Sequence, residues 1–184
     1  MTIYLFSLLP QGFKELDIKP SESYAEHNCL RWTGESKIAS WRTPDLIWFS
    51  DELSDDADID GDFLNFRGGA PAISAKAYKV LQPLLENSVE FLPVTIQGET
   101  RQLINVTNVL PLMDIAKSTF KIYNDGKIGP CQHAHLNDPD PKELIFMVNG
   151  YFPRIFINDE LKKRIEEAGL TGVLIREYLN PAAK

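Results

Sequence analysis

The residues closest to a known chemical motif are three aspartates at alternate positions. Asp56, Asp58 and Asp60 precede Gly61, which matches the first half of the EF-hand calcium loop, D-x-D-x-D-G. That loop needs a bidentate glutamate at its twelfth position, where this chain has Arg67. Because a cation in a ligand position opposes calcium binding, the pattern favours a solvated acidic loop, with capture of a basic protein as its functional version.

Cysteine and histidine residues gather in two short tracts. His27 and Cys29 form H-x-C, and Cys131, His133 and His135 form C-x-H-x-H. Thiolate and imidazole are suitable zinc ligands, but structural zinc sites usually separate paired ligands by about two to four residues. The pattern therefore favours polar residues of a hairpin, with a zinc site at Cys131, His133 and His135 as the alternative, and we expect no cofactor.

Motifs for nucleophilic catalysis or phosphate binding are missing from the sequence. No G-x-S-x-G elbow is present, and three histidines permit a catalytic set by number only. Gly68 and Gly69 are followed by Pro71 and lack the G-K-[ST] of a phosphate loop, so they predict a tight turn. We therefore predict no catalytic residues and a protein that is not an enzyme.

Length and composition predict a globular protein of one domain, residues 1–184, or at most two small packed lobes of about residues 1–70 and 71–184. The net charge of −7 argues against nucleic acid and anionic membranes as partners. Two cysteines are too few for a disulfide framework, and neither a secretion signal nor a membrane span is evident. These features predict a cytoplasmic protein.

The clearest structural signal is residues 155–178, which predict one helix leading into one strand. Asn158 is placed as the N-cap, with carboxylates in the first turn where they suit the positive end of the helix. Gly169 is expected to end the helix in a left-handed conformation, which places Leu170 over Ile165 as in a Schellman motif. Residues 173–175 then begin the strand.

A similar unit begins 84 residues earlier, with Ser74 as the N-cap. At that offset Leu81 corresponds to Ile165. Shared local sequence preferences explain the likeness as well as an internal repeat does. Pro83 predicts that the first helix ends or kinks near Gln82, and Pro93 predicts an edge strand or a bulge.

The remaining pattern predicts an α+β fold with a mostly antiparallel sheet, two capped helix-to-strand units and few helices. Strands are expected at residues 3–9 and 46–49, with hairpins that turn at 97–100, 124–126 and the Asn149-Gly150 pair. Residues 11–40 predict irregular structure with one strand near 29–33. The order of strands and the oligomeric state are left open.

The succession of these segments resembles a known family. The chain contains PDLIWFS, an acidic segment ending in DFL, GGAPAISAKAYKVLQPLLENSVEFLPVTI, INVTNVLPLMD and FPRIFINDELKKRIEEAGLTGVLI. This order is similar to that of a bacterial immunity-protein family from polymorphic toxin systems, once catalogued as a domain of unknown function and typified by a myxobacterial protein. The resemblance covers about residues 44–175 and rests on no catalytic motif, whereas residues 1–43 match only loosely.

The resemblance implies a cytosolic protein that is not an enzyme and that binds and neutralises a cognate bacterial toxin. It supplies no catalytic residues to carry over. The acidic loop suits a basic toxin domain, through electrostatic steering. Its expected toxin-binding residues are Asp55, Asp56, Asp58, Asp60 and Asp62. The alternatives are a metal-dependent enzyme that uses the Cys131, His133 and His135 tract, and a regulatory domain that binds a small ligand between the two helix-strand units.

Overall fold

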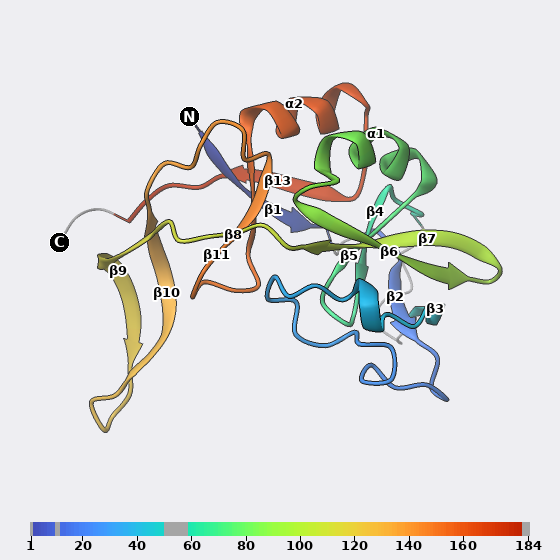
Figure 1. The fold of residues 1–184 in the computed structure, drawn as a ribbon, viewed down its shortest axis with the longest axis horizontal. Helices are drawn as coiled ribbons and strands as arrows, with labels where there is room; N and C mark the ends of the chain where they lie inside the picture. Colours follow the sequence, from blue (N-terminus) through green and yellow to red (C-terminus); the bar gives the residue numbers. More distant parts are fainter. Residues whose placement is uncertain (1, 10–11, 50–58, 182–184) are drawn as a thin grey trace.

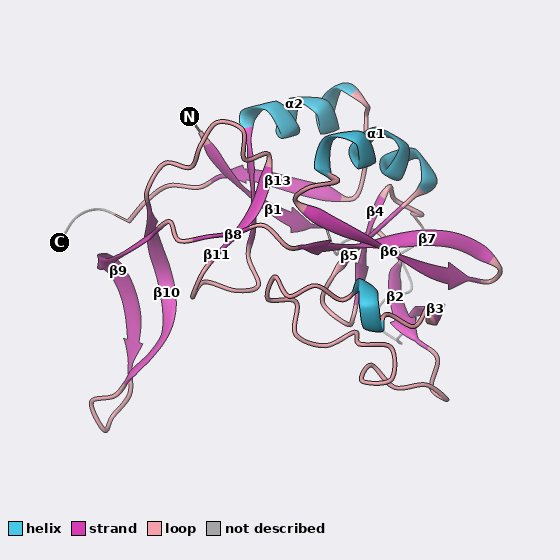
Figure 2. Cartoon of the chain, in the orientation of Figure 1, coloured by secondary structure: helices cyan, strands magenta, loops and turns pink. Residues whose placement is uncertain are grey.

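The computed structural model describes residues 2–9, 12–49 and 59–181, and strands dominate this part of the chain (Figure 2). The two α-helices in it lie beside one another on one side of the strands (Figure 1). Neither of them is long and apolar enough to cross a membrane. The expectation of an α+β fold with few helices is confirmed, and a closed barrel is added to it.

Six strands close into a small barrel in the order β2-β3-β6-β7-β5-β4. Alternate side chains of its strands point inward and exclude water, among them Leu16, Leu46, Phe66, Leu92 and Leu103. The barrel strands are β2 (Glu15–Ile18), β3 (Asp45–Phe49), β4 (Phe63–Phe66), β5 (Pro71–Ile73), β6 (Val89–Ile96) and β7 (Glu99–Val106). Strands β2, β3 and β4 precede residue 70, and β5, β6 and β7 follow it, so the barrel combines segments from both of the possible lobes, about residues 1–70 and 71–184.

A five-stranded sheet in the order β13-β1-β12-β11-β8 adjoins the barrel. Its pairs are antiparallel except for β11 with β8. Phe146 and Phe156 are buried on one face of this sheet, and Ile145 and Ile157 are buried on the other against the helices. The strands are β1 (Ile3–Leu8), β8 (Val109–Leu110), β11 (Ile145–Val148), β12 (Ile155–Asn158) and β13 (Val173–Glu177).

The two helix-strand units share one topology. Helix α1 (Ala75–Leu85) connects β5 to β6, and both of these strands pair antiparallel with β7, which lies between them. Helix α2 (Asp159–Glu167) connects β12 to β13, which flank β1 in the same way. Leu81 and Ile165, which correspond at the 84-residue offset, are both buried in one cluster between the helices and the strands. Each unit is therefore a split β-α-β motif.

The predicted caps of the second unit are confirmed. The Asn158 side chain accepts a hydrogen bond of 2.9 Å from the backbone N–H of Leu161. At the other end, Gly169 has φ +57°, and Leu170 donates to the Ile165 carbonyl while Gly169 donates to that of Glu166. This double hydrogen bond is the Schellman ending expected from the sequence.

The first helix does not end at Gln82 but continues through Pro83 to Leu85. Pro83 removes the hydrogen bond to the carbonyl of Lys79, and both residues are exposed, so water can reach that carbonyl. Leu81 and Leu85 are each 1% exposed in the core. Burial of these two side chains outweighs the local preference of proline to end a helix.

We expect Pro83→Ala to raise the free energy of unfolding by about 1 kcal/mol, because alanine restores a helical N–H at an exposed position. Urea unfolding followed by circular dichroism measures the change. Pro111→Ala, at an exposed position outside the strands, is the matched control and should give no gain. A loss of stability in Pro83→Ala would show that the helix requires the proline.

Two local predictions differ from the structure, and a third is met. Residues 29–33 are not a strand, and the strand of this region is β2, whose Leu16 and Ile18 face the barrel interior. Strands β11 and β12 are joined by residues 149–154 rather than by a two-residue Asn149-Gly150 turn. Pro93 lies in the part of β6 that pairs with β7 alone, as expected of an edge, and the pairing carries no bulge there.

A hairpin arm extends from the body of the molecule (Figure 1). It consists of β9 (Met113–Ile122) and β10 (Ile128–Leu136), which among the described strands pair only with one another, and it turns at Gly126 as predicted. The register shifts three times along the arm. Its base is packed, because Ala134 and Leu136 are buried beside Phe156 in the face of the five-stranded sheet.

Candidate functional site

An open groove of about 570 Å³ lies on the outer side of β2 and β3 and beside the segment that connects them. Its lining combines aromatic, aliphatic and acidic side chains. Partners across an antiparallel pair of strands share one face, so Asp17 and Ile47 point outward together, as do Glu15 and Phe49. The residues that line the groove are Asp17, Ile18, Lys19, Pro20, Glu22, Ser23, Tyr24, Ile47, Trp48 and Phe49.

Asp17 is the best-connected acid of the groove. It pairs with Arg67 at 3.3 Å between Oδ2 and Nε, and its Oδ1 accepts a hydrogen bond from the Tyr24 hydroxyl. Burial, together with this acceptor, raises the pKa of Tyr24 to about 12, so the hydroxyl stays protonated and keeps donating. The Arg67 guanidinium also lies 3.8 Å from the ring centre of Phe49. These contacts hold the wall of the groove in place.

Glu22 supplies the second carboxylate of the groove. Its Oε2 lies 3.1 Å from Nε2 of His27, whose Nδ1 lies 2.8 Å from the backbone carbonyl of Arg42. Lys19, the cation of the lining, is paired with Asp45. The groove therefore offers apolar contact area next to carboxylates, which is the combination that a lysine or arginine side chain of a partner protein requires.

Part of the predicted acidic segment lies outside the described residues. Phe49 lines the groove and is the last described residue before the segment, and the described chain resumes at Ile59, which forms a β-bridge with Phe13. Of the five predicted toxin-binding residues, three lie outside the described residues. These are Asp55, Asp56 and Asp58.

The other two predicted toxin-binding acids have partners within the fold. Asp60 pairs with Arg101, whose side chain is buried and also donates to the Gly61 carbonyl at 3.2 Å. Asp62 is 13% exposed at its side chain. It accepts hydrogen bonds from the Ser74 hydroxyl at 2.7 Å and the Thr171 backbone N–H at 3.1 Å. Asp62 thereby joins the start of α1 to the turn before β13.

The cysteine and histidine tracts do not come together as a ligand set. Within residues 2–9, 12–49 and 59–181, no three His, Cys, Asp or Glu side chains are grouped so that they could hold a metal ion. Cys29 is fully buried in the barrel cluster, and burial raises its pKa to about 12. The register shifts on both sides of His133, and its Nε2 lies 3.1 Å from the backbone carbonyl of Leu179. The tract that contains Cys131 and His135 is therefore part of the packed base of the arm.

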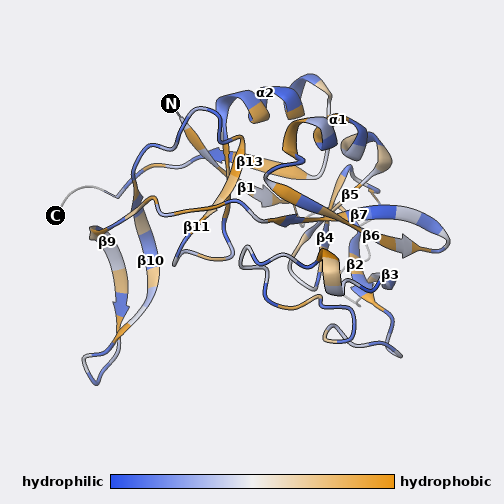
Figure 3. Ribbon diagram, in the orientation of Figure 1, coloured by the Kyte–Doolittle hydropathy of each residue, from blue (hydrophilic) through white to orange (hydrophobic). Residues whose placement is uncertain are grey.

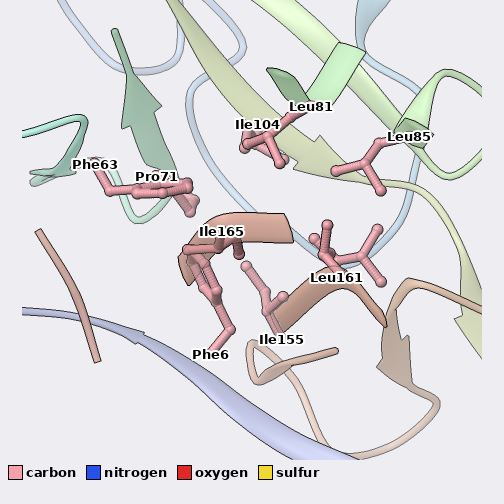
Figure 4. Close-up of a pocket in the computed structure, with 10 residues that line it drawn as sticks. Phe6, Phe63, Pro71, Leu81, Leu85, Ile104, Ile155, Leu161 and Ile165 are labelled. Carbon is pink, nitrogen blue, oxygen red and sulfur yellow. The ribbon is translucent and has the colours of Figure 1, made fainter. Parts of the chain in front are cut away.

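The space between the helices α1 and α2 holds no room for a small ligand. The cavity there has a volume of about 10 Å³ and a wholly apolar lining, which includes Leu81 and Leu85 from α1 and Leu161 and Ile165 from α2. Figure 4 shows these side chains pointing toward one another. Ligand pockets have volumes of roughly 300–1,000 Å³, so this cavity belongs to the core.

A comparison of the chain with models of known protein families finds no match, and no curated protein matches it significantly.

The groove was not predicted from the sequence, because β2 was not predicted and the pairing of β2 with β3 creates the groove. The alternation in ELDI, residues 15–18, is the signal that could have indicated β2.

Proposed function

We propose that the protein is a cytoplasmic immunity-type inhibitor that binds a basic bacterial toxin domain. The observation that supports this most strongly is the groove, where the apolar side chains of Ile47 and Phe49 lie beside the carboxylates of Asp17 and Glu22. A net charge of −7 favours fast association with a basic partner. The resemblance of residues 44–175 to an immunity-protein family agrees with this role.

The groove and the segment have different tasks in this proposal. Ile47 and Phe49 provide the apolar contact area that gives an interface most of its binding energy. Glu22 and Asp17 accept a basic side chain that enters the groove. Asp55, Asp56 and Asp58 attract the toxin before contact, with Asp60 and Asp62 at the base of the segment where they maintain the fold.

The test is binding of the toxin domain encoded by the neighbouring gene to charge variants of this chain. We expect Glu22→Lys and the triple variant Asp55→Asn, Asp56→Asn, Asp58→Asn each to weaken binding by at least about tenfold, and more in low salt. Isothermal titration calorimetry at two salt concentrations measures this. The matched control is Glu167→Lys on α2, which has the same charge change and should bind as the parent does. Equal weakening in the control and in Glu22→Lys would contradict the proposed location of the site.

A further inference from the structure

The segment that follows β11 begins with Asn149-Gly150, the one Asn-Gly pair in the sequence. The chain passes here from a buried hydrophobic strand to exposed hydrophilic backbone, a change that can be followed in Figure 3. Both residues of the pair are exposed, and Gly150 has φ +78°. The pair does not make the two-residue hairpin turn expected of it, so its side chain and backbone are open to water.

The backbone nitrogen of Gly150 is free, whereas its two neighbours are not. Asn149 donates its N–H to the Leu110 carbonyl at 3.0 Å, and Tyr151 donates to the Val148 carbonyl at 2.9 Å. Among the described residues, no backbone carbonyl accepts the N–H of Gly150. Glycine has no Cβ atom, so nothing on the residue hinders approach of its nitrogen to the preceding side chain. The amide nitrogen that can attack Asn149 is therefore the available one.

An exposed asparagine after α1 provides an internal comparison. Asn87 is followed by Ser88, whose N–H donates to the Leu85 carbonyl at 2.8 Å. An N–H that is held in a hydrogen bond reacts only when local opening breaks that bond. The two sites thus differ in the state of the reacting N–H as well as in the residue that follows the asparagine.

We propose that Asn149 is a site of spontaneous deamidation in the folded protein, with water as the co-reactant. The nitrogen of Gly150 attacks Cγ of Asn149, and an N–C bond forms. The bond from Cγ to Nδ2 breaks, and the proton of the attacking nitrogen passes through water to Nδ2, which leaves as ammonia. Water then opens the cyclic imide at one of its two carbonyls, which gives aspartate or isoaspartate. No oxidant or reductant is needed, and each product adds a negative charge.

The isoaspartyl product lengthens the main chain by one atom at position 149. The hydrogen bond from Tyr151 to Val148 spans the inserted atom. Tyr151 is 4% exposed, and its ring centre lies 6.3 Å from that of Phe156 in the face of the five-stranded sheet. Because a longer backbone displaces Tyr151 from β11, the isoaspartyl chain unfolds more readily than the parent.

The test is peptide mapping by mass spectrometry of the purified full chain, aged in folded form without any toxin, so it is independent of the proposed function. Cleavage after Lys142 and Arg154 releases residues 143–154. We expect this peptide to gain about 1 Da and to separate into two products. The rate should rise with pH, because the attack requires loss of the N–H proton.

The structural part of the proposal is tested by comparing rates. Asn149 should react at least about tenfold faster than Asn87, and within about threefold of a synthetic peptide of residues 143–154, because the fold does not protect its neighbouring N–H. Asn149→Gln is the matched control, which keeps an amide but needs a larger ring, and its peptide should gain no mass over the same period. A folded chain that reacts at Asn149 more than about tenfold slower than the peptide, or no faster than at Asn87, would overturn the proposal.

A second measurement separates the added charge from the added backbone atom. Aged chains that carry the extra charge are isolated by anion exchange and compared with freshly purified Asn149→Asp, which has the same charge and an ordinary backbone. We expect the aged chains to unfold at a urea midpoint lower by about 0.5 M. Equal midpoints would contradict the expected displacement of Tyr151.

Discussion

Replacing Gly172 by alanine is expected to lower the free energy of unfolding by about 4 kcal/mol, at the upper end of what single substitutions do. Gly172 has φ +89°, and a Cβ atom there would lie 2.0 Å from the carbonyl oxygen of Phe63. That oxygen belongs to the backbone of β4 and is held in place, because the Phe63 N–H donates to the Thr171 carbonyl at 2.9 Å. The Leu9 N–H binds the Gly172 carbonyl from the other side at 3.0 Å. Relief of the clash therefore requires separating β4 from the turn before β13.

Gly169→Ala is the matched control for this experiment. Gly169 also has positive φ, +57°, but no heavy atom lies within 4 Å of the Cβ position. The free energy of unfolding of Gly169→Ala should therefore fall by only about 1 kcal/mol, the cost of placing an alanine in the left-handed conformation. Urea unfolding of both variants measures the difference. Similar losses in the two variants would contradict the close approach of Gly172 to β4.

Replacing Asp62 by asparagine is expected to cost about 2–3 kcal/mol at neutral pH, because hydrogen bonds to a charged acceptor are lost at a largely buried position. Its Oδ2 receives the Thr171 N–H at 3.1 Å and Lys76 Nζ at 3.3 Å. In the asparagine variant, an amide nitrogen in place of Oδ2 would set its own N–H donors against those of Thr171 and Lys76. The variant thus weakens the link between the start of α1 and the turn that precedes β13.

The effect of Asp62 depends on pH in a defined direction. Burial opposes its ionisation, but the hydrogen bonds from Ser74, Thr171 and Lys76 outweigh burial and lower its pKa below the ordinary value of 3.8. The stabilisation is therefore complete above pH 3.8 and is lost as the pH falls through the lowered pKa. We expect the difference between the parent and Asp62→Asn in urea unfolding to shrink in acid.

The exposed Asp138 provides a control, because Asp138→Asn should unfold like the parent at neutral pH. If the difference in the free energy of unfolding between the parent and Asp62→Asn stayed constant down to strongly acidic pH, a charged role for Asp62 would be contradicted.

Local sequence signals predict the elements whose geometry is set by neighbouring residues. Asn158 caps α2 and Gly169 ends it, because side chain and backbone complete these hydrogen bonds within one turn. Ser74 caps α1 for the same reason, with Ala77 as the donor. The two units, which resemble each other in sequence, also share a split β-α-β topology. That topology is set by the pairing of distant strands.

Contacts between distant segments explain what the sequence did not predict. Strand β2 is short, and its identity depends on pairing with β3 and β4, which lie roughly 30 and 50 residues further along the chain. The length of α1 depends on the burial of Leu85 rather than on Pro83. The groove likewise requires segments 17–24 and 47–49 to meet, so a list of local motifs could not reveal it.

Acidic residues in one short segment have two kinds of role in this account. Asp60 and Asp62 were predicted as toxin-binding residues from their acidic neighbours, and both have internal partners in the fold. Their substitution is therefore expected to affect stability as well as binding. Glu22 also has an internal partner, His27, so the fold of Glu22→Lys must be verified before its binding is measured.

The central claim, that this chain neutralises a cognate toxin, is tested most directly by co-expression with the product of the neighbouring gene. We predict that the parent chain restores growth of cells that produce the toxin, and that the two proteins co-purify as a complex that high salt weakens. Glu167→Lys should rescue growth equally well, and Glu22→Lys should rescue it less. Continued toxicity together with no complex at low salt would contradict the account.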